Sequence, residues 1–242
     1  MTGPTAAERI ALRARWVTIA GLAVLVLLAW AWLLAGAGMA DVAMHGVAGA
    51  APFTTIVAMW FVMMVAMMVP SAAPIILLYA RVQRHGGTSP PTAAFLAGYL
   101  ACWLGFSLLV AALQLAITEP MSMALESRAA SAALLVAAGI YQLSPLKDAC
   151  LSRCRSPAQF LSRHYRPGAA GALRLGLLHG VFCVGCCWLL MALLFVGGVM
   201  NLAWIALLTL LVAAEKLLPK GEWLARIVGV AMIGWGFALL VI

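Results

Sequence analysis

Residues 53–80 read FTTIVAMWFVMMVAMMVPSAAPIILLYA, a run without one charged side chain. A helix of about 20 such residues spans the roughly 30 Å hydrocarbon core of a bilayer. The whole chain has this character, because 66% of its 242 residues are hydrophobic and 9% are charged. Its mean hydropathy is +1.08. We therefore expect an all-α, polytopic membrane protein, and the composition excludes soluble enzymes, disordered chains and disulfide-stabilised secreted domains.

Seven apolar stretches can be drawn, each near the length that a membrane-spanning helix needs. They cover residues 16–38, 53–80, 92–118, 128–146, 171–196, 200–217 and 223–242. We expect a single helical bundle over residues 1–242, with no separate soluble domain. The number of spans falls to six if the tight turn at Gly197-Gly198 belongs to a re-entrant hairpin. Pro70 and Pro74 predict a bend in the second stretch.

The basic residues indicate topology rather than a nucleic-acid partner. Of the 15 Lys and Arg residues, all but Arg128 fall on one side if the N-terminus is cytoplasmic. The positive-inside rule then places the N-terminus in the cytoplasm and the C-terminus outside. Because these residues are spread over several short segments, they form no single patch, and the expected partner is the lipid bilayer.

The strongest chemical signal lies in the fifth stretch, which reads HGVFCVGCCWLLM from His179 to Met191. At about 100° per residue, His179, Cys183, Cys186 and Cys187 fall on one face of a helix. Soft thiolate and imidazole donors select Cu(I) or Zn(II), so we expect these four side chains to bind a metal. A thiol redox centre is the competing interpretation, although neighbours on one helix pair poorly.

Methionines in the second stretch favour copper over zinc. Met59, Met63 and Met67 are one turn apart on one face, and thioether sulfur prefers Cu(I) to Zn(II). We expect Met63 and Met67 to be the donors that face the cysteines. The alternative is that this row packs the core, which is the more common role of methionine.

Two further groups of residues extend the predicted metal path. Cys150 and Cys154, four residues apart at the inner surface, predict additional ligands. Their neighbour Lys147 is expected to contact lipid head groups, and Glu215-Lys216 is expected to anchor a helix end at the inner surface. Cys102 is expected to pack rather than bind. The candidates for metal capture in the outer segments are Asp41, Met44, His45, Glu119, Met121 and Met123.

Several of these pieces together resemble a known family. They are AMMVP at 66–70, YQLSPLK at 141–147 with Cys150, Cys154 and Arg155, the His179–Met191 motif, GVMNL at 198–202, and Glu215-Lys216. The combination resembles the bacterial predicted metal-binding integral membrane proteins, a domain of unknown function. The resemblance implies metal binding in the bacterial inner (plasma) membrane.

The preferred hypothesis is an inner-membrane bundle that binds Cu(I), with Zn(II) as the weaker alternative. It would transport the ion or deliver it to a periplasmic or membrane protein partner. One alternative is a membrane thiol-redox or metal-dependent enzyme, and another is a structural or assembly subunit whose sulfur-rich faces pack helices. The sequence contains no nucleotide-binding or familiar hydrolase motif, so a non-enzymatic role is favoured.

Overall fold

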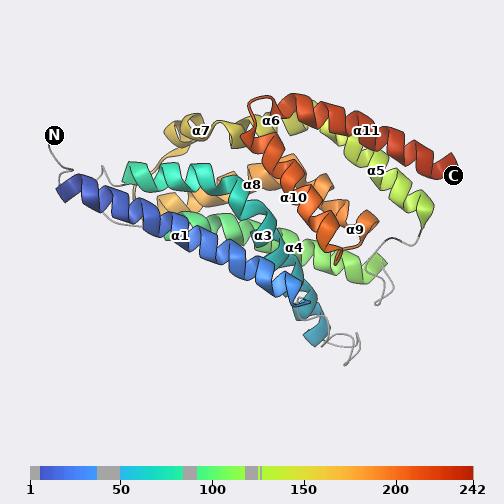
Figure 1. Ribbon diagram of the computed structural model, residues 1–242, viewed down its shortest axis with the longest axis horizontal. Helices are drawn as coiled ribbons and strands as arrows, with labels where there is room; N and C mark the ends of the chain where they lie inside the picture. The colour runs from blue at the N-terminus through green and yellow to red at the C-terminus, as the bar shows by residue number, and fades with distance from the viewer. Residues whose placement is uncertain (1–5, 37–49, 84–91, 118–124, 126, 242) are drawn as a thin grey trace.

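The computed structural model describes residues 6–36, 50–83, 92–117, 125 and 127–241, and this part contains no strand. The prediction of an all-α protein is confirmed. The described helices are α1 (Ala6–Leu34), α3 (Ala50–Gln83), α4 (Thr92–Ile117), α5 (Arg128–Gln142), α6 (Pro145–Arg155), α7 (Pro157–His164), α8 (Gly168–Ala192), α9 (Leu194–Gly197), α10 (Leu202–Leu217) and α11 (Gly221–Val241), as Figure 1 shows.

Five helical segments of the described chain are long and apolar enough to cross a membrane. They are Arg15–Leu34, Phe53–Val82, Thr92–Ala116, Gly168–Gly197 and Gly221–Val241. α5 and α6 together would make a sixth, bent by 63°. α10 has 16 residues and is therefore about 24 Å long, which is short for a hydrocarbon core of about 30 Å. Length and composition thus support five or six spans, where seven, or six with a re-entrant hairpin, were predicted.

The predicted fourth stretch, 128–146, ends early at a proline. Pro145 disfavours helical backbone at the residue before it and has no N–H to donate to the carbonyl of Tyr141. That carbonyl instead accepts from Ser144, whose own hydroxyl accepts from the Lys147 N–H at 3.2 Å. Ser144 is thus the N-cap of a new helix. The segment between the predicted stretches 128–146 and 171–196, expected at the inner surface, forms most of α6 and all of α7.

α3 is the central helix of the bundle (Figure 1). It packs against α1, α4 and α10, while α8 packs along α4, and α5 and α11 lie side by side. Its ribbon changes direction near the middle in Figure 1, and Pro70 and Pro74 lie inside the helix. The methionines at 59, 63, 64, 67 and 68 each expose 0% of their surface. α3 is therefore buried on several faces rather than along one stripe.

α4 and α8 approach closely through two glycines. A Cβ atom at Gly98 would collide with the backbone of Leu173, and one at Gly176 would collide with the backbone of Phe95. Small residues at helix crossings allow the backbones of membrane helices to come together. The crossing fixes Tyr99, which follows Gly98, beside the cysteines of α8.

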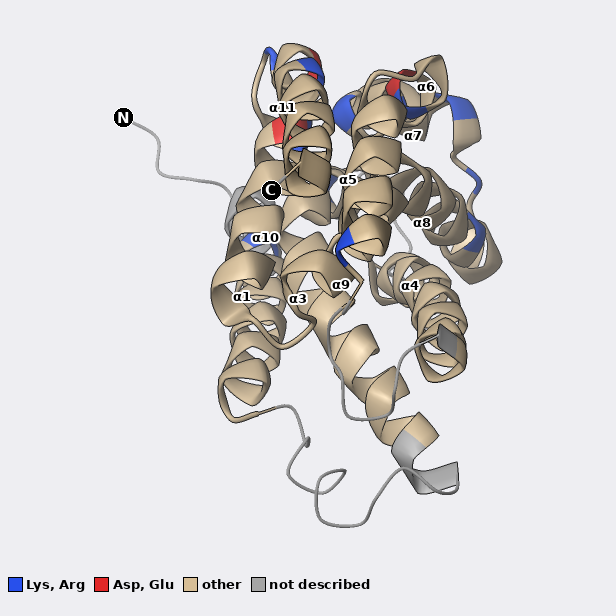
Figure 2. Cartoon of the chain, turned by 90° about the vertical axis from the view of Figure 1, so that its right-hand side faces the viewer, with Lys and Arg blue, Asp and Glu red and all other residues tan. Residues whose placement is uncertain are grey.

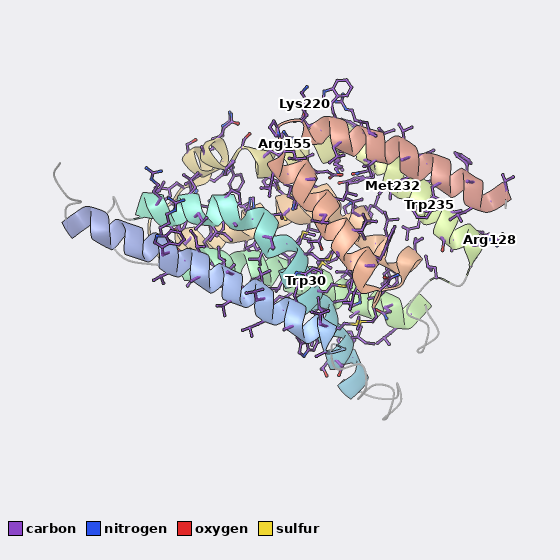
Figure 3. The ribbon with its side chains drawn as sticks, in the orientation of Figure 1. Trp30, Arg128, Arg155, Lys220, Met232 and Trp235 are labelled. Carbon is purple, nitrogen blue, oxygen red and sulfur yellow. The ribbon has the colours of Figure 1, made fainter. Side chains whose placement is uncertain are left out.

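The periphery is apolar along the flanks and charged mainly at one end. Leu109 and Leu210 each expose 68% of their surface. Lys and Arg gather around α6, α7 and the nearby ends of α8 and α11 (Figure 2). Arg128 lies at the far end of the α5–α11 pair from Arg155 and Lys220 (Figure 3). This distribution is typical of a membrane bundle, although the side assigned to each end stays a prediction.

Candidate metal centre

One face of α8 carries three buried thiols. Cys183, Cys186 and Cys187 each expose 1% of their surface. The thiols of Cys186 and Cys187 donate to the carbonyl of Cys183 at 3.1 Å and 2.9 Å. These bonds hold both sulfur atoms close to their own helix, on the side where other helices pack.

Two further sulfur atoms reach this face from other helices. The Sδ atom of Met68, from α3, lies 3.9 Å from the Sγ atom of Cys187. The Sγ atom of Cys154, from α6, lies 4.0 Å from that of Cys186. We refer to Met68, Cys154, Cys183, Cys186 and Cys187 as the sulfur cluster. The second and fifth predicted stretches therefore meet, a contact that helical spacing within each stretch could not establish.

A lysine and a tyrosine complete the surroundings of Cys183. Lys216 Nζ, from α10, donates to Cys183 Sγ at 3.0 Å, to Ser71 Oγ at 3.3 Å and to Met68 Sδ at 3.9 Å. The Tyr99 hydroxyl lies 3.2 Å from Cys183 Sγ and 3.2 Å from the Met68 carbonyl, to which it donates. A buried ammonium group is stable only beside partners that compensate its charge. At Lys216 those partners are sulfur and hydroxyl groups.

The carboxylate of Glu215 points into a separate buried network. Its Oε2 atom lies 2.6 Å from Lys147 Nζ, and its Oε1 atom accepts from Gln142 Nε2 at 2.7 Å. Lys147 also donates to the side-chain oxygen of Gln142, and it exposes 0% of its surface. The expectation that Lys147 contacts lipid head groups is therefore wrong, because its ammonium group has a carboxylate partner inside the bundle.

Arg155 binds the last turn of α6 to the C-terminal end of α10, the helix that carries Glu215. Its guanidinium donates to the carbonyls of Glu215 at 3.3 Å, Leu218 at 2.9 Å and Pro219 at 2.5 Å. Carbonyl groups at a helix C-terminus lack partners within the helix and attract cations. α6 is thus tied to the end of α10 near its first turn by Lys147 and in its last turn by Arg155. Cys154 comes directly before this second tie.

His179 lies beside the sulfur cluster, one turn before Cys183, among aromatic rings. Its ring centroid is 5.7 Å from that of Tyr99, 6.2 Å from that of Phe95 and 5.5 Å from that of Phe160. Its Nδ1 atom is buried and has no hydrogen-bond partner among the described residues. The imidazole therefore keeps a free nitrogen, and its role as a ligand stays a prediction.

The predicted methionines occupy the core next to the site. Met59, Met63 and Met67 are fully buried in the hydrophobic core, and the methionine sulfur found 3.9 Å from the Cys187 sulfur is that of Met68. Since α3 is buried on several faces, helical spacing could not indicate which strip of methionines would meet α8. Cys150 lies with its sulfur against Gly185 of α8, on the same flank as Cys154.

The residues proposed for capture of metal in outer segments lie outside the described residues. They are Asp41, Met44, His45, Glu119, Met121 and Met123.

Three side chains at the cluster were not predicted as its members. For Lys216 a signal existed, because an ionisable residue within the apolar stretch 200–217 is by default a functional candidate. Met68 lies on the helical face next to the predicted row of Met59, Met63 and Met67. Tyr99 had no local signal, since its position depends on the crossing of α4 and α8.

The donor set fits a soft metal ion by its chemistry. Thiols and a thioether are the ligands that Cu(I) prefers, and all six cysteines of the chain are free. Within the described residues, no three His, Cys, Asp or Glu side chains are grouped as a ready metal site. The sulfur atoms are therefore neighbours that would need side-chain rotation to bind one ion together.

A family model described as PpoB2, a copper chaperone, matches residues 57–239. The matched range contains every member of the sulfur cluster, together with Tyr99 and Lys216. No curated protein and no solved structure matches the chain. The link to copper that the soft donors predict is confirmed at the level of the family.

Proposed function

Since the chain belongs to the copper chaperone family, we propose that it holds Cu(I) on the sulfur cluster and delivers it to a protein partner at the bacterial inner membrane. Copper is the cargo in this proposal. The observation that carries it is the gathering of five sulfur atoms from α3, α6 and α8 in one cluster, four of them on fully buried residues.

The donors differ in their expected roles. Thiolates bind soft metals far better than thiols do, so Cys183, beside Lys216, and Cys186 are the two expected thiolate ligands. Cys154, 4.0 Å from Cys186, is the thiol through which the ion would be exchanged. Met68 and Cys187 lie within reach as further sulfur donors. His179 and Cys150 flank the cluster and remain candidates for a second set.

The charge of Lys216 supports Cu(I) over Zn(II). Two thiolates and one ammonium group sum to a single negative charge, which a monovalent ion cancels. A divalent ion would leave the buried site with a net positive charge. Burying uncompensated charge costs on the order of several kcal/mol in a protein interior. The lysine 3.0 Å from Cys183 therefore favours the monovalent ion.

The composition of the bundle supports a membrane location. Five described segments are long and apolar enough to cross a bilayer, and leucines on α4 and α10 point outward with most of their surface exposed. Under the positive-inside rule, the arginine-rich end formed by α6 and α7 faces the cytoplasm. This orientation places Cys154 near the cytoplasmic surface.

Thiol–disulfide exchange is a second candidate function, favoured by one contact. Cys154 and Cys186 lie on different helices with their sulfur atoms 4.0 Å apart, so they escape the restriction on cysteine neighbours along one helix. A redox partner would use this pair, whereas a copper carrier needs both thiols reduced.

Metal analysis separates the two functions. Full-length protein loaded with Cu(I) under reducing conditions should retain stoichiometric copper after desalting, and Cys183→Ser/Cys186→Ser/Cys187→Ser should lose it. Cys102→Ser is the matched control, because Cys102 lies on α4 against Gly180. Copper that survives the triple change would refute the assigned site. A Cys154–Cys186 disulfide in a chain that binds no metal would favour redox exchange.

A further inference from the structure

One member of the sulfur cluster is less buried than the others. Met68, Cys183, Cys186 and Cys187 each expose 1% or less of their surface, whereas Cys154 is half-buried. If copper resides on the cluster, as proposed above, exchange with a carrier in solution is expected to begin at this least buried member. The surroundings of Cys154 therefore determine which carriers can approach.

A polar pocket of about 180 Å³ lies between α6 and α7, next to Cys154 in the chain. Ser152, Arg153 and Ser156 contribute from α6 and the junction, and Gln159, Arg163 and His164 contribute from α7, with the buried Phe160 as an apolar wall. No carboxylate lines this pocket. Its lining therefore suits an anion.

The two arginines are available to such a ligand. In the described part of the chain the ion pairs are Lys147–Glu215 and Arg226–Asp148, so neither Arg153 nor Arg163 is engaged by a carboxylate there. The Arg153 guanidinium lies 4.8 Å from the ring centre of Phe182 on α8. Stacking of this kind holds a guanidinium in place while leaving its N–H donors free for carboxylate or phosphate.

Arg153 and Cys154, which are consecutive residues of α6, both contact α8. Arg153 directly precedes Cys154 on α6, and Phe182 lies one turn before Cys186 on α8. The contacts Arg153–Phe182 and Cys154–Cys186 are therefore neighbours along one interface. Cys154 does not itself line the pocket, so a ligand anchored on Arg153 would reach the Cys154 sulfur with groups that extend beyond the pocket along this interface.

We propose that this pocket binds the carboxylates of an anionic low-molecular-weight thiol carrying Cu(I), and that the ion passes between this carrier and Cys154. The exchange changes no oxidation state. A Cu–S bond to Cys154 forms, a Cu–S bond to the carrier thiolate breaks, and the proton of the Cys154 thiol passes to the departing thiolate. A phospholipid phosphate would satisfy the arginines but brings no soft donor to the thiol.

Copper loading from two carriers tests the proposal. Full-length protein in uncharged detergent is mixed with Cu(I) bound either to glutathione, which is anionic, or to 2-mercaptoethanol, which is neutral. Arg153→Gln/Arg163→Gln should load about tenfold more slowly from glutathione, because charge-assisted hydrogen bonds are lost. Its rate from 2-mercaptoethanol and its final copper content should match those of the unsubstituted protein. Arg166→Gln, an exposed arginine outside the pocket lining, should load normally from both.

Each other outcome rejects the pocket. Equal slowing from both carriers would mean that the arginines act only on the structure, and unchanged rates would mean that they bind no carrier. Arginine-dependent binding of phosphatidylglycerol vesicles with unchanged loading would assign the pocket to a lipid head group. Cys154→Ser should slow loading from both carriers, and normal loading in this variant would also reject the proposal. An unsubstituted protein that takes copper from neither carrier would instead refute the proposed function.

Discussion

Two helices of this protein are rich in sulfur, and their surroundings differ. Met59 and Met63 of α3 are packed in the hydrophobic core. The cysteine face of α8 meets Lys216 from α10, Tyr99 from α4 and Cys154 from α6. Met68 is the point at which both rows come together. The comparison teaches that sulfur at helical spacing indicates a site only where polar groups from other helices reach it.

The largest expected effect on this comparison comes from removing the buried ion pair that joins α6 to α10. Glu215→Ala leaves the fully buried Lys147 ammonium group without its carboxylate. Removing one partner of a buried ion pair costs about 3–5 kcal/mol. We expect a loss of this size in the free energy of unfolding, measured by denaturant titration in detergent, with faster alkylation of Cys154.

A double variant and an exposed acid provide the controls for that measurement. Lys147→Met/Glu215→Leu replaces both charges and should recover most of the stability, while Glu222→Gln, at an exposed position, should change little. A stable Glu215→Ala protein with a protected Cys154 thiol would show that the ion pair does not hold α6 in place.

Lys216 gives a second test of the comparison, because its charged group contacts the cysteine face of α8. Lys216→Met removes the ammonium group 3.0 Å from Cys183 Sγ. We expect the affinity for Cu(I) to fall by about tenfold, equivalent to about 1.4 kcal/mol, and the preference for Cu(I) over Zn(II) to narrow. Competition with chelators for each metal measures both quantities.

Arginine at the same position keeps the charge, so Lys216→Arg should retain the preference for Cu(I). Lys220→Met, at an exposed lysine, should behave as the unsubstituted protein does. An unchanged metal preference in Lys216→Met would remove the charge argument for Cu(I).

The smallest expected effect compares methionines within α3. Met68→Leu conserves most of the side-chain volume and removes the thioether 3.9 Å from Cys187 Sγ, so Cu(I) affinity should fall a few-fold. Met63→Leu/Met67→Leu should leave it nearly unchanged if those side chains serve packing. The reverse ranking in a Cu(I) competition titration would restore Met63 and Met67 as the facing donors.

The sequence could predict the helices and the cysteine-bearing stretch because both depend on local pattern. Apolar runs of sufficient length indicate α1, α3, α4, α8 and α11. The prediction of one helix over residues 128–146 was wrong. The hydropathy of this stretch is continuous, but the dipeptide Ser144-Pro145 ends α5 and begins α6. Hydropathy averages over this dipeptide and therefore hides the break.

Side chains whose role depends on distant partners could not be placed from the sequence. The sequence around Lys147 resembles that of an ordinary cytoplasmic loop. Its carboxylate partner, Glu215, lies 68 residues later in the chain. Lys216 adjoins Glu215, which made a surface pair the natural interpretation. In the structure the two side chains enter different environments, one toward Cys183 and the other toward Lys147.

The 63° change of direction between α5 and α6 governs how residue 154 reaches α8. A straight continuation of α5 would carry that residue about 18 Å beyond Gln142 along one axis, at 1.5 Å per residue. Because of the bend, α6 packs against α8 and places the Cys154 sulfur 4.0 Å from that of Cys186. One residue added or deleted at Leu143-Ser144 would rotate α6 by about 100° relative to α5, turning its thiol away from its neighbour. The length of this junction is thus a structural requirement of its own, independent of which residues α6 contains.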